Sequence, residues 1–436
     1  MNLGDANPHR ALHNRLTATE YKPQSKTNHL VSYILVSYFL ISYYLVSFFL
    51  YLWRVEKNMP FIFGMLAGEM DFTNRSAETE HLMRNFEGGV NTILISPRRW
   101  GKSSLVAHTG RTLQRKNKKI RVCHLDIFGA KNEAEFYSLY SSAILSAVSN
   151  RLDDAVEFSR KFLSRFIPKL SIQPHPDSEI SIALDWKEVQ KNPDEILNLP
   201  ESIAKSKNMR LVICIDEFQN IGSFENPLAF QKKLRSIIQK HKHVTYCFYG
   251  SKRHMMMNVF TSPSMPFYKF GDIIFLDKIK KTDLMRFVQK RFRDTGKSID
   301  KANAALICDL TECHPYYTQQ LAQQVWLQTQ RKADSSIVMA SHERLINQFS
   351  FFFQVQSDSL SSPQINYLHA LIMKETKLSG KDVIERYRLG TSANVIKIRQ
   401  ALQEREIIDS LEGYPQILDP YFAEWLKTRY FGNRKF

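Results

Sequence analysis

One short stretch, TILISPRRWGKSSL (92–105), constrains the fold more than any other part of the sequence. Its apolar start predicts a buried strand over 92–96, and after a tight loop the pattern predicts a helix over 102–116. Such a loop and helix start present backbone N–H groups to phosphate oxygens. We predict that ATP binds through Ser96, Pro97, Arg98, Arg99, Trp100, Gly101, Lys102, Ser103 and Ser104.

Two residues of this loop have chemical roles of their own. Lys102 supplies a positive charge to the outer phosphates and to the transition state, and Ser103 offers a hydroxyl to Mg²⁺. The spacing departs from GxxxxGK[ST] at one place, because Ser96 stands where the first glycine belongs. The strand, loop and helix that the motif requires are nevertheless all present in the pattern. We therefore predict ATP and Mg²⁺ as the cofactors.

A second stretch, LVICIDEFQN (211–220), supplies two acids. Its apolar run predicts a strand that ends at Asp216 and Glu217. In P-loop enzymes the aspartate at such a strand end holds Mg²⁺. The adjacent Glu217 is suited to orient and deprotonate an attacking water molecule. We therefore predict Asp216 as a metal ligand and Glu217 as the general base.

Further strands are predicted at 119–128, 244–250 and 272–277, with helical stretches between them. Strands that alternate with helices favour a parallel sheet covered on both faces. The long separation of Lys102 from Asp216 predicts another strand between the loop strand and the acid strand. After the strand at 244–250, Ser251 could sense the γ-phosphate or the attacking water, and Arg253 could sense the charge of the γ-phosphate. The equal alternative is that Ser251 and Arg253 are solvent-exposed polar residues that simply end the strand.

The rest of the globular chain divides into two predicted parts. Residues 281–358 show helical periodicity throughout, which predicts a helical lid. Residues 359–436 predict a winged helix, with three helices opened by Ser362, Ser379 and Ser392, a hairpin and a last helix. The third helix would read DNA if DNA were the partner, but its basic residues stand among glutamates. DNA and a protein partner both stay open.

Charge and cysteine usage narrow the class of protein. The net charge of +17 permits an anionic partner, but the basic residues are scattered along the chain. The five cysteines are odd in number and show no CxxC spacing. This pattern excludes a disulfide framework and a zinc site and fits a reducing compartment. We predict a cytoplasmic protein, with a single-pass membrane protein carrying a cytoplasmic ATPase as the alternative.

Several motifs together resemble a known family: the prokaryotic ATPases first grouped from archaea, common also in Bacteroidetes. These belong to the STAND branch of AAA-like P-loop NTPases. The motifs are SPRRWGKSSL (96–105), LVICIDEFQNI (211–221), FYGSKRHMM (248–256), FYKFGD (267–272), HPYYTQQL (314–321) and LDPYFAEWL (418–426). The resemblance covers about Met59 to Tyr430. It implies an additional-strand P-loop domain, a helical lid and a C-terminal winged helix. It also implies that His314 and Pro315 face the adenine, although Cys313 replaces the usual glycine before them.

Residues 30–53 form an apolar block without a charged residue, long enough to span a bilayer as a helix. The block is a tandem pentad (LVSYI, LVSYF, LISYY, LVSFF), so its serines spiral around a helix and form no packing face. The basic residues flanking it would place the ATPase outside the cell. We interpret residues 1–29 as disordered. We interpret residues 1–58 as a whole as sequence upstream of the true start, translated in the same reading frame. A transmembrane anchor at 30–53 is the alternative.

The sequence as a whole predicts an α/β P-loop ATPase that acts as a nucleotide-dependent switch. The expected domains are a P-loop ATPase domain at 59–280, a lid at 281–358 and a winged helix at 359–436. Slow turnover and a nucleotide-dependent oligomer are compatible with this assignment. A DNA-binding regulator gated by ATP and a membrane-tethered ATPase are the two alternatives.

Overall fold

The structure is a computed structural model that describes residues 59–69, 71–149, 193–410 and 413–432 in full and the backbone of 170–173, 181–184 and 411. Within these ranges, no helix combines the length and apolar character needed to cross a membrane. The apolar block at 30–53, and with it the interpretation of residues 1–58, lies outside them. All five cysteines are free.

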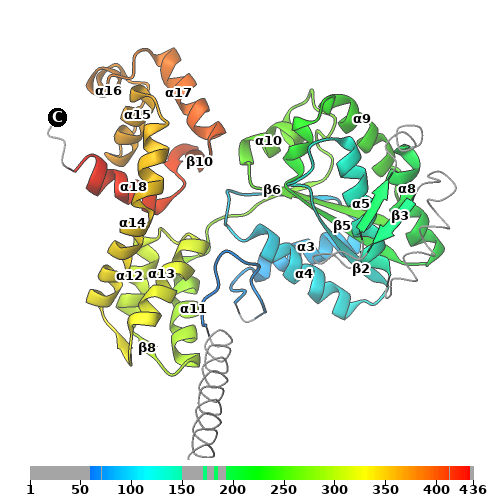
Figure 1. Cartoon of the computed structure of the whole chain (residues 1–436), viewed down its shortest axis with the longest axis horizontal. Helices are drawn as coiled ribbons and strands as arrows, with labels where there is room; N and C mark the ends of the chain where they lie inside the picture. The colour runs from blue at the N-terminus through cyan, green and yellow to red at the C-terminus, as the bar shows by residue number, and fades with distance from the viewer. Residues whose placement is uncertain are drawn as a thin grey trace, which may run out of the picture. The chain divides into compact units, whose positions relative to one another are not determined.

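A five-stranded parallel sheet is the framework for the predicted site (Figure 1). The strand order is β2-β5-β6-β1-β7, so β6 lies between the loop strand β1 and the acid strand β5, as the sequence predicted. The strands are β1 (Thr92–Ile95), β2 (Ile120–Asp126), β5 (Arg210–Asp216), β6 (Val244–Gly250) and β7 (Asp272–Phe275). Because all five run in one direction, their carboxyl ends meet at one edge, where ligands bind in such sheets.

Helices cover both faces of the sheet, because alternate residues of the buried strands are apolar on both sides. On one face, α3 (Ser76–Gly88) and α4 (Lys102–Lys116) pack through Leu82, Phe86 and Leu105. The other face is covered by α5 (Glu133–Val148), α8 (Pro193–Ser206), α9 (Pro227–Ile238) and α10 (Arg253–Thr261). The predicted α/β class with a parallel sheet is confirmed.

A short antiparallel pair, β3 (Leu170–Gln173) and β4 (Ser181–Leu184), is not among the strands that the sequence analysis predicted. The lid contains α11 (Lys281–Asp294), α12 (Lys301–Leu310), α13 (Pro315–Gln328) and α14 (Ser335–Asp358). It is not wholly helical, because β8 (Ser298–Ile299) pairs in parallel with β9 (Lys332–Ala333). Strands of two residues are too short to leave a period in the sequence.

The C-terminal part has the predicted winged-helix order. It comprises α15 (Ser362–Ile372), α16 (Lys381–Arg386), α17 (Ser392–Glu404), the hairpin of β10 (Ile408–Leu411) and β11 (Tyr414–Ile417), α18 (Pro420–Trp425) and the π-helical turn η2 (Leu426–Tyr430). The predicted serine caps were each wrong by one residue. The residues at the N-caps are Ser361, Gly380 and Thr391. Ser361 also forms a capping box with Gln364. At Ser361-Ser362 and at Thr391-Ser392, two adjacent hydroxyl residues could each cap the helix, and the sequence pattern does not distinguish the two positions.

Candidate nucleotide site

The phosphate loop leaves β1 at Ser96 and enters α4 at Lys102. Gly101 forms the helix N-cap with φ of 90°, a left-handed conformation that glycine adopts without steric cost. A Cβ at Gly101 would meet nothing within 4 Å, so its backbone conformation, and not space, favours glycine here. The N–H groups of the first helical turn have no partners inside the helix and are available to an anion.

Lys102 is buried, and its ammonium group is held by oxygens of the loop itself. Nζ donates to the carbonyl of Ser96 at 2.9 Å, to Ser96 Oγ at 3.2 Å and to the carbonyl of Pro97 at 2.8 Å. Burial lowers the pKa of Lys102 to about 8, against the opposing charges of Asp216 and Glu217. Ser96, where the motif has glycine, thus supplies a hydroxyl acceptor that a glycine lacks.

Of the two acids, Asp216 ends β5 and Glu217 follows it, and both line the cavity with the phosphate loop. Asp216 Oδ2 accepts a hydrogen bond of 2.6 Å from Ser103 Oγ. Burial raises the pKa of Asp216 to about 6, although the Ser103 hydrogen bond works against the rise. A hydroxyl and a carboxylate at this separation are oxygen donors of the kind that Mg²⁺ prefers. The residues present therefore fit a magnesium ion.

Glu217 lies one residue beyond the strand, with φ of 53°. Its Oε2 accepts hydrogen bonds from Ser251 Oγ at 3.0 Å, from Ser251 N at 3.3 Å and from Gln219 Nε2 at 2.5 Å. The strand ends of β5 and β6 are adjacent in the sheet, which brings Glu217 and Ser251 together. Sequence reasoning gave Gln219 no role, although it stands within the motif LVICIDEFQNI (211–221), because a glutamine after the two acids has no assigned chemistry in that pattern.

These groups line one cavity of about 400 Å³, a size typical of small-molecule sites. The cavity is lined by Asp216, Glu217 and Ser251, by most of the phosphate loop, and by residues of the lid and of the N-terminal segment. Predicted residues that line it are Arg98, Arg99, Trp100, Gly101, Lys102, Ser103, Ser104, Asp216, Glu217, Ser251 and Pro315. Ser96 and Pro97 lie behind the cavity, against the Lys102 ammonium group.

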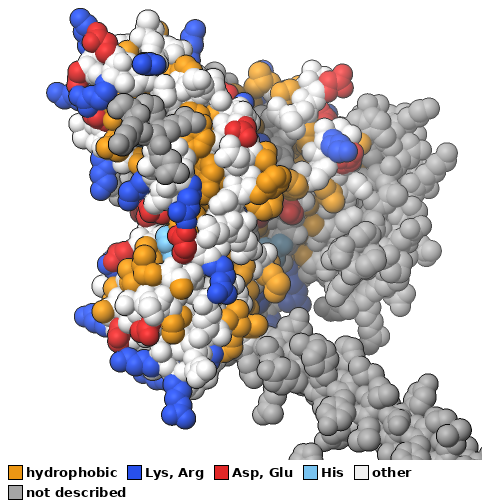
Figure 2. All heavy atoms as spheres, turned by 60° about the vertical axis from the view of Figure 1, so that its left-hand side comes forward, with side chains coloured by type: hydrophobic (Ala, Val, Ile, Leu, Met, Phe, Trp, Pro, Cys, Tyr) orange, Lys and Arg blue, Asp and Glu red, His pale blue; other side chains and the backbone are white. Residues whose placement is uncertain are grey.

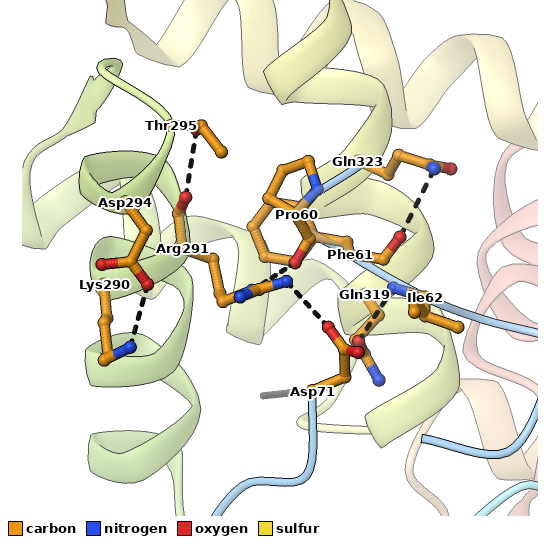
Figure 3. Close-up of polar contacts among 10 residues, drawn as sticks. All are labelled: Pro60, Phe61, Ile62, Asp71, Lys290, Arg291, Asp294, Thr295, Gln319 and Gln323. Carbon is orange, nitrogen blue, oxygen red and sulfur yellow. Dashed lines mark hydrogen bonds and ion pairs between the residues drawn. The ribbon is translucent and has the colours of Figure 1, made fainter. Parts of the chain in front are cut away.

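The segment 60–73, which we call the strap, forms another wall of this cavity and is fixed to the lid (Figure 3). Arg291 of α11 donates from Nε to the Pro60 carbonyl at 2.5 Å and from Nη2 to Asp71 Oδ1 at 2.8 Å. Gln319 of α13 accepts from Ile62 N at 3.2 Å. Burial raises the pKa of Asp71, and the Arg291 charge opposes this. The strap is therefore bound to the lid and lines the same cavity as the phosphate loop.

His314 and Pro315 stand at the start of α13. Pro315 lines the cavity, whereas buried His314 lies behind Trp100, with ring centroids 6.3 Å apart. Burial lowers the pKa of His314 to about 3, so the imidazole is neutral at pH 7. Cys313 has φ of 56°, a conformation in which glycine would meet less steric strain. The cysteine adopts a left-handed conformation that is costly for its side chain.

Arg253 is only two residues beyond Ser251 but does not line the cavity. Its Nη1 donates to Asp409 Oδ1 at 3.0 Å and to the Ser410 carbonyl at 2.9 Å, both on β10 of the winged helix. The structure thus separates the two predicted sensors. Ser251 contacts Glu217 in the site, and Arg253 contacts the wing.

Comparisons with known proteins identify the two domains and similar folds. Residues 72–343 match a family described as an ATPase domain predominantly from Archaea, and residues 351–428 match a probable winged helix domain. The Walker-type ATPase PABY2304 of Pyrococcus abyssi is 15% identical with a TM-score of 0.59, over 85% of this chain and 100% of that one. The ORC2 protein of Aeropyrum pernix, in ADPNP and ADP complexes, is 14% identical with a TM-score of 0.51, over 81% and 93%. No curated protein matches the chain.

Proposed function

The chain belongs to the family of ATPase domains found predominantly in Archaea and is an ATP-binding ATPase. On that premise we propose that it is a STAND-type switch, in which Mg²⁺ and ATP bound in the 400 Å³ cavity set the state of the lid and the winged helix. One observation carries this proposal. The wall of a single cavity is built from the phosphate loop, the two acids, the strap and the lid.

Each polar residue of the cavity has a role in this proposal. The α4 N-terminus and Lys102 bind the outer phosphates, and Lys102 exchanges its loop carbonyl partners for phosphate oxygens. Ser103 and Asp216 would hold Mg²⁺, which neutralises phosphate charge when it is bound. Glu217 orients the attacking water and accepts its proton. Ser251 contacts Glu217 and reports on the occupied site.

The switch requires a connection from the loop to the distant parts, and Arg99 supports one. Its guanidinium lies 4.5 Å from the centroid of the Tyr316 ring on α13. The next residue, Tyr317, donates its hydroxyl to Asp419 at the N-cap of α18 in the winged helix. A shift of the loop around phosphate therefore displaces residues that touch the lid and, through them, the winged helix.

Turnover and nucleotide binding, measured on the full chain with Mg²⁺, test the proposed chemistry. Glu217→Gln keeps the shape of the side chain and loses the base, so ATP should still bind while kcat falls by about 10²-fold. Asp216→Ala should instead remove the Mg²⁺-dependent part of ATP binding. Normal hydrolysis by Glu217→Gln would remove the base assignment.

The switch itself is tested by hydrogen exchange on Glu217→Gln, which should hold ATP unhydrolysed. We expect ATP with Mg²⁺ to change amide protection in α13 and in the winged helix as well as in α4. The matched control is Lys102→Ala under the same conditions, in which these changes should be absent. Protection confined to the phosphate loop would contradict a switch.

DNA is a second candidate partner, favoured by Lys397 and Arg399 on the exposed side of α17. Figure 2 shows, however, that basic side chains on the lid and winged helix are dispersed among acidic, hydrophobic and neutral ones. A protein partner or a second copy of the chain fits such a mixed surface equally well. Lys397→Glu with Arg399→Glu should weaken a salt-dependent gel shift if DNA is bound, and unchanged binding would exclude α17 as the reader.

A further inference from the structure

Gln219 is a buried polar residue beside the proposed base, and the phosphate-binding chemistry leaves it without a role. It lies in the 3-10 turn η1 (Phe218–Ser223) that directly follows Glu217, and it is 1% exposed. Its amide Nε2 donates to Glu217 Oε2 at 2.5 Å. Its own Oε1 is buried without a hydrogen-bond partner.

This arrangement is unfavourable for a residue that serves packing alone. A buried amide oxygen without a partner destabilises the fold, and an apolar side chain of the same shape would avoid that cost. The amide orientation that leaves Oε1 unpaired is the one that turns the N–H donors toward the carboxylate. The neighbouring Glu217 is itself in a left-handed backbone conformation, which non-glycine residues adopt only where the surroundings impose it.

The end of strand β6 completes the contact from the other side. Ser251 donates to the same Glu217 oxygen from both N and Oγ. Gly250 leaves room for the glutamine, because a Cβ there would lie 1.8 Å from Gln219 Oε1. Three donors from two strand ends thus converge on one carboxylate oxygen.

We propose that Gln219 is a positioning residue for ATP hydrolysis, which together with Ser251 fixes the Glu217 carboxylate at the attacking water and depends on Gly250 for its own place. The inference rests on the proposed role of Glu217 as the base. Gln219 acts through Glu217 and touches no phosphate, so it sets kcat and leaves nucleotide affinity unchanged.

The test compares Gln219→Met with a matched control in the full chain. Gln219→Met keeps length and burial but removes the donor, and we expect kcat to fall by about tenfold or more while the Kd for ATP changes less than about twofold. The control is Gln231→Met in α9, since Gln231 is also 1% exposed with a buried, unpartnered Oε1 but lies outside the cavity. Its kcat should equal that of the wild type.

Two further variants separate the possible outcomes. Gly250→Ala should reproduce the loss of kcat by displacing an intact Gln219, and it serves if Gln219→Met does not fold. Adding Gln219→Met to Glu217→Gln should cause no further loss, because one acts through the other. Wild-type kcat in Gln219→Met, or a weakened ATP Kd equal to the fall in kcat, would overturn this inference. Normal turnover in Glu217→Gln would instead overturn the proposed base.

Discussion

The sheet region and the lid with its winged helix bury their apolar side chains in different ways. The sheet has separate clusters on its two faces, each closed by its own helices. The lid and the winged helix share one continuous cluster, which runs from Ile279 to Phe431 and includes Phe61 of the strap. A shared core resists separation, because splitting it would expose apolar surface to water. We therefore expect the lid and winged helix to behave as one body.

Two ion pairs, one from the lid to the strap and one from the wing to α10, differ in burial. Asp71 in the strap pairs with Arg291 of the lid, and both side chains are buried. Arg253 at the start of α10 pairs with Asp409 of the wing, and these side chains are 24% and 13% exposed, against 9% and 8% for Arg291 and Asp71. Because the wing pair is the less buried of the two, water and salt screen it more, and we expect it to open more readily than the strap pair. The difference suggests a fixed strap and a releasable wing.

The largest expected effect is on the sheet side of this comparison. Lys102→Ala removes the charge for the outer phosphates and should reduce ATP turnover by at least about 10²-fold while the fold persists. Circular dichroism and an ATP turnover assay would check the two parts of this expectation. The control is Lys116→Ala at the far end of the same helix, which should keep wild-type turnover. Wild-type turnover in Lys102→Ala would remove the phosphate-loop assignment.

Features with a local signal could be predicted from the sequence, whereas contacts between distant segments could not. The strand at 244–250 and the loop around Lys102 were predictable, because apolar runs and glycine–lysine spacing are local signals. The Arg253–Asp409 pair and the Gln219–Gly250 fit join residues that the sheet order and wing position bring together. Such long-range contacts leave no periodic pattern in the local sequence. The serine caps failed for a third reason: adjacent hydroxyl residues gave equal signals at Ser361 and Thr391, and in the remaining helix Gly380 occupies the cap next to Ser379.

The shared core leads to the next expectation, for two phenylalanines on α14. Phe353 is 5% exposed and packs on Phe422 and Trp425 of the winged helix, whereas Phe351 is 73% exposed. Phe353→Ala should lower the free energy of unfolding by about 3 kcal/mol and loosen the lid and winged helix together. Phe351→Ala should change it by less than about 0.5 kcal/mol. Hydrogen exchange that loosens only one of the two parts would break the one-body interpretation.

A smaller effect is expected on the sheet side, from His241 at the end of α9. Burial lowers its pKa from 6.5 to about 4, and its ring contacts Tyr246 and Asn198. The unfolded chain binds this proton more readily than the folded one between those pH values. Stability should therefore fall by roughly 2 kcal/mol as the pH drops from about 6.5 to 4. Denaturant unfolding of His241→Gln should show a flatter pH dependence, and an unchanged slope would contradict the assignment.

The smallest expected effect is at the wing contact itself. Arg253→Lys and Asp409→Asn each weaken the pair, and a double-mutant cycle should give a coupling of about 0.5–1 kcal/mol in the free energy of unfolding. Because the pair joins α10 to β10, its loss should raise hydrogen exchange in the wing while the shared core around Phe353 stays protected. Added salt should reduce the coupling, since screening acts on exposed charges. A coupling of several kcal/mol that salt does not change would mean that the wing is held as firmly as the strap, and the contrast between the two contacts would disappear.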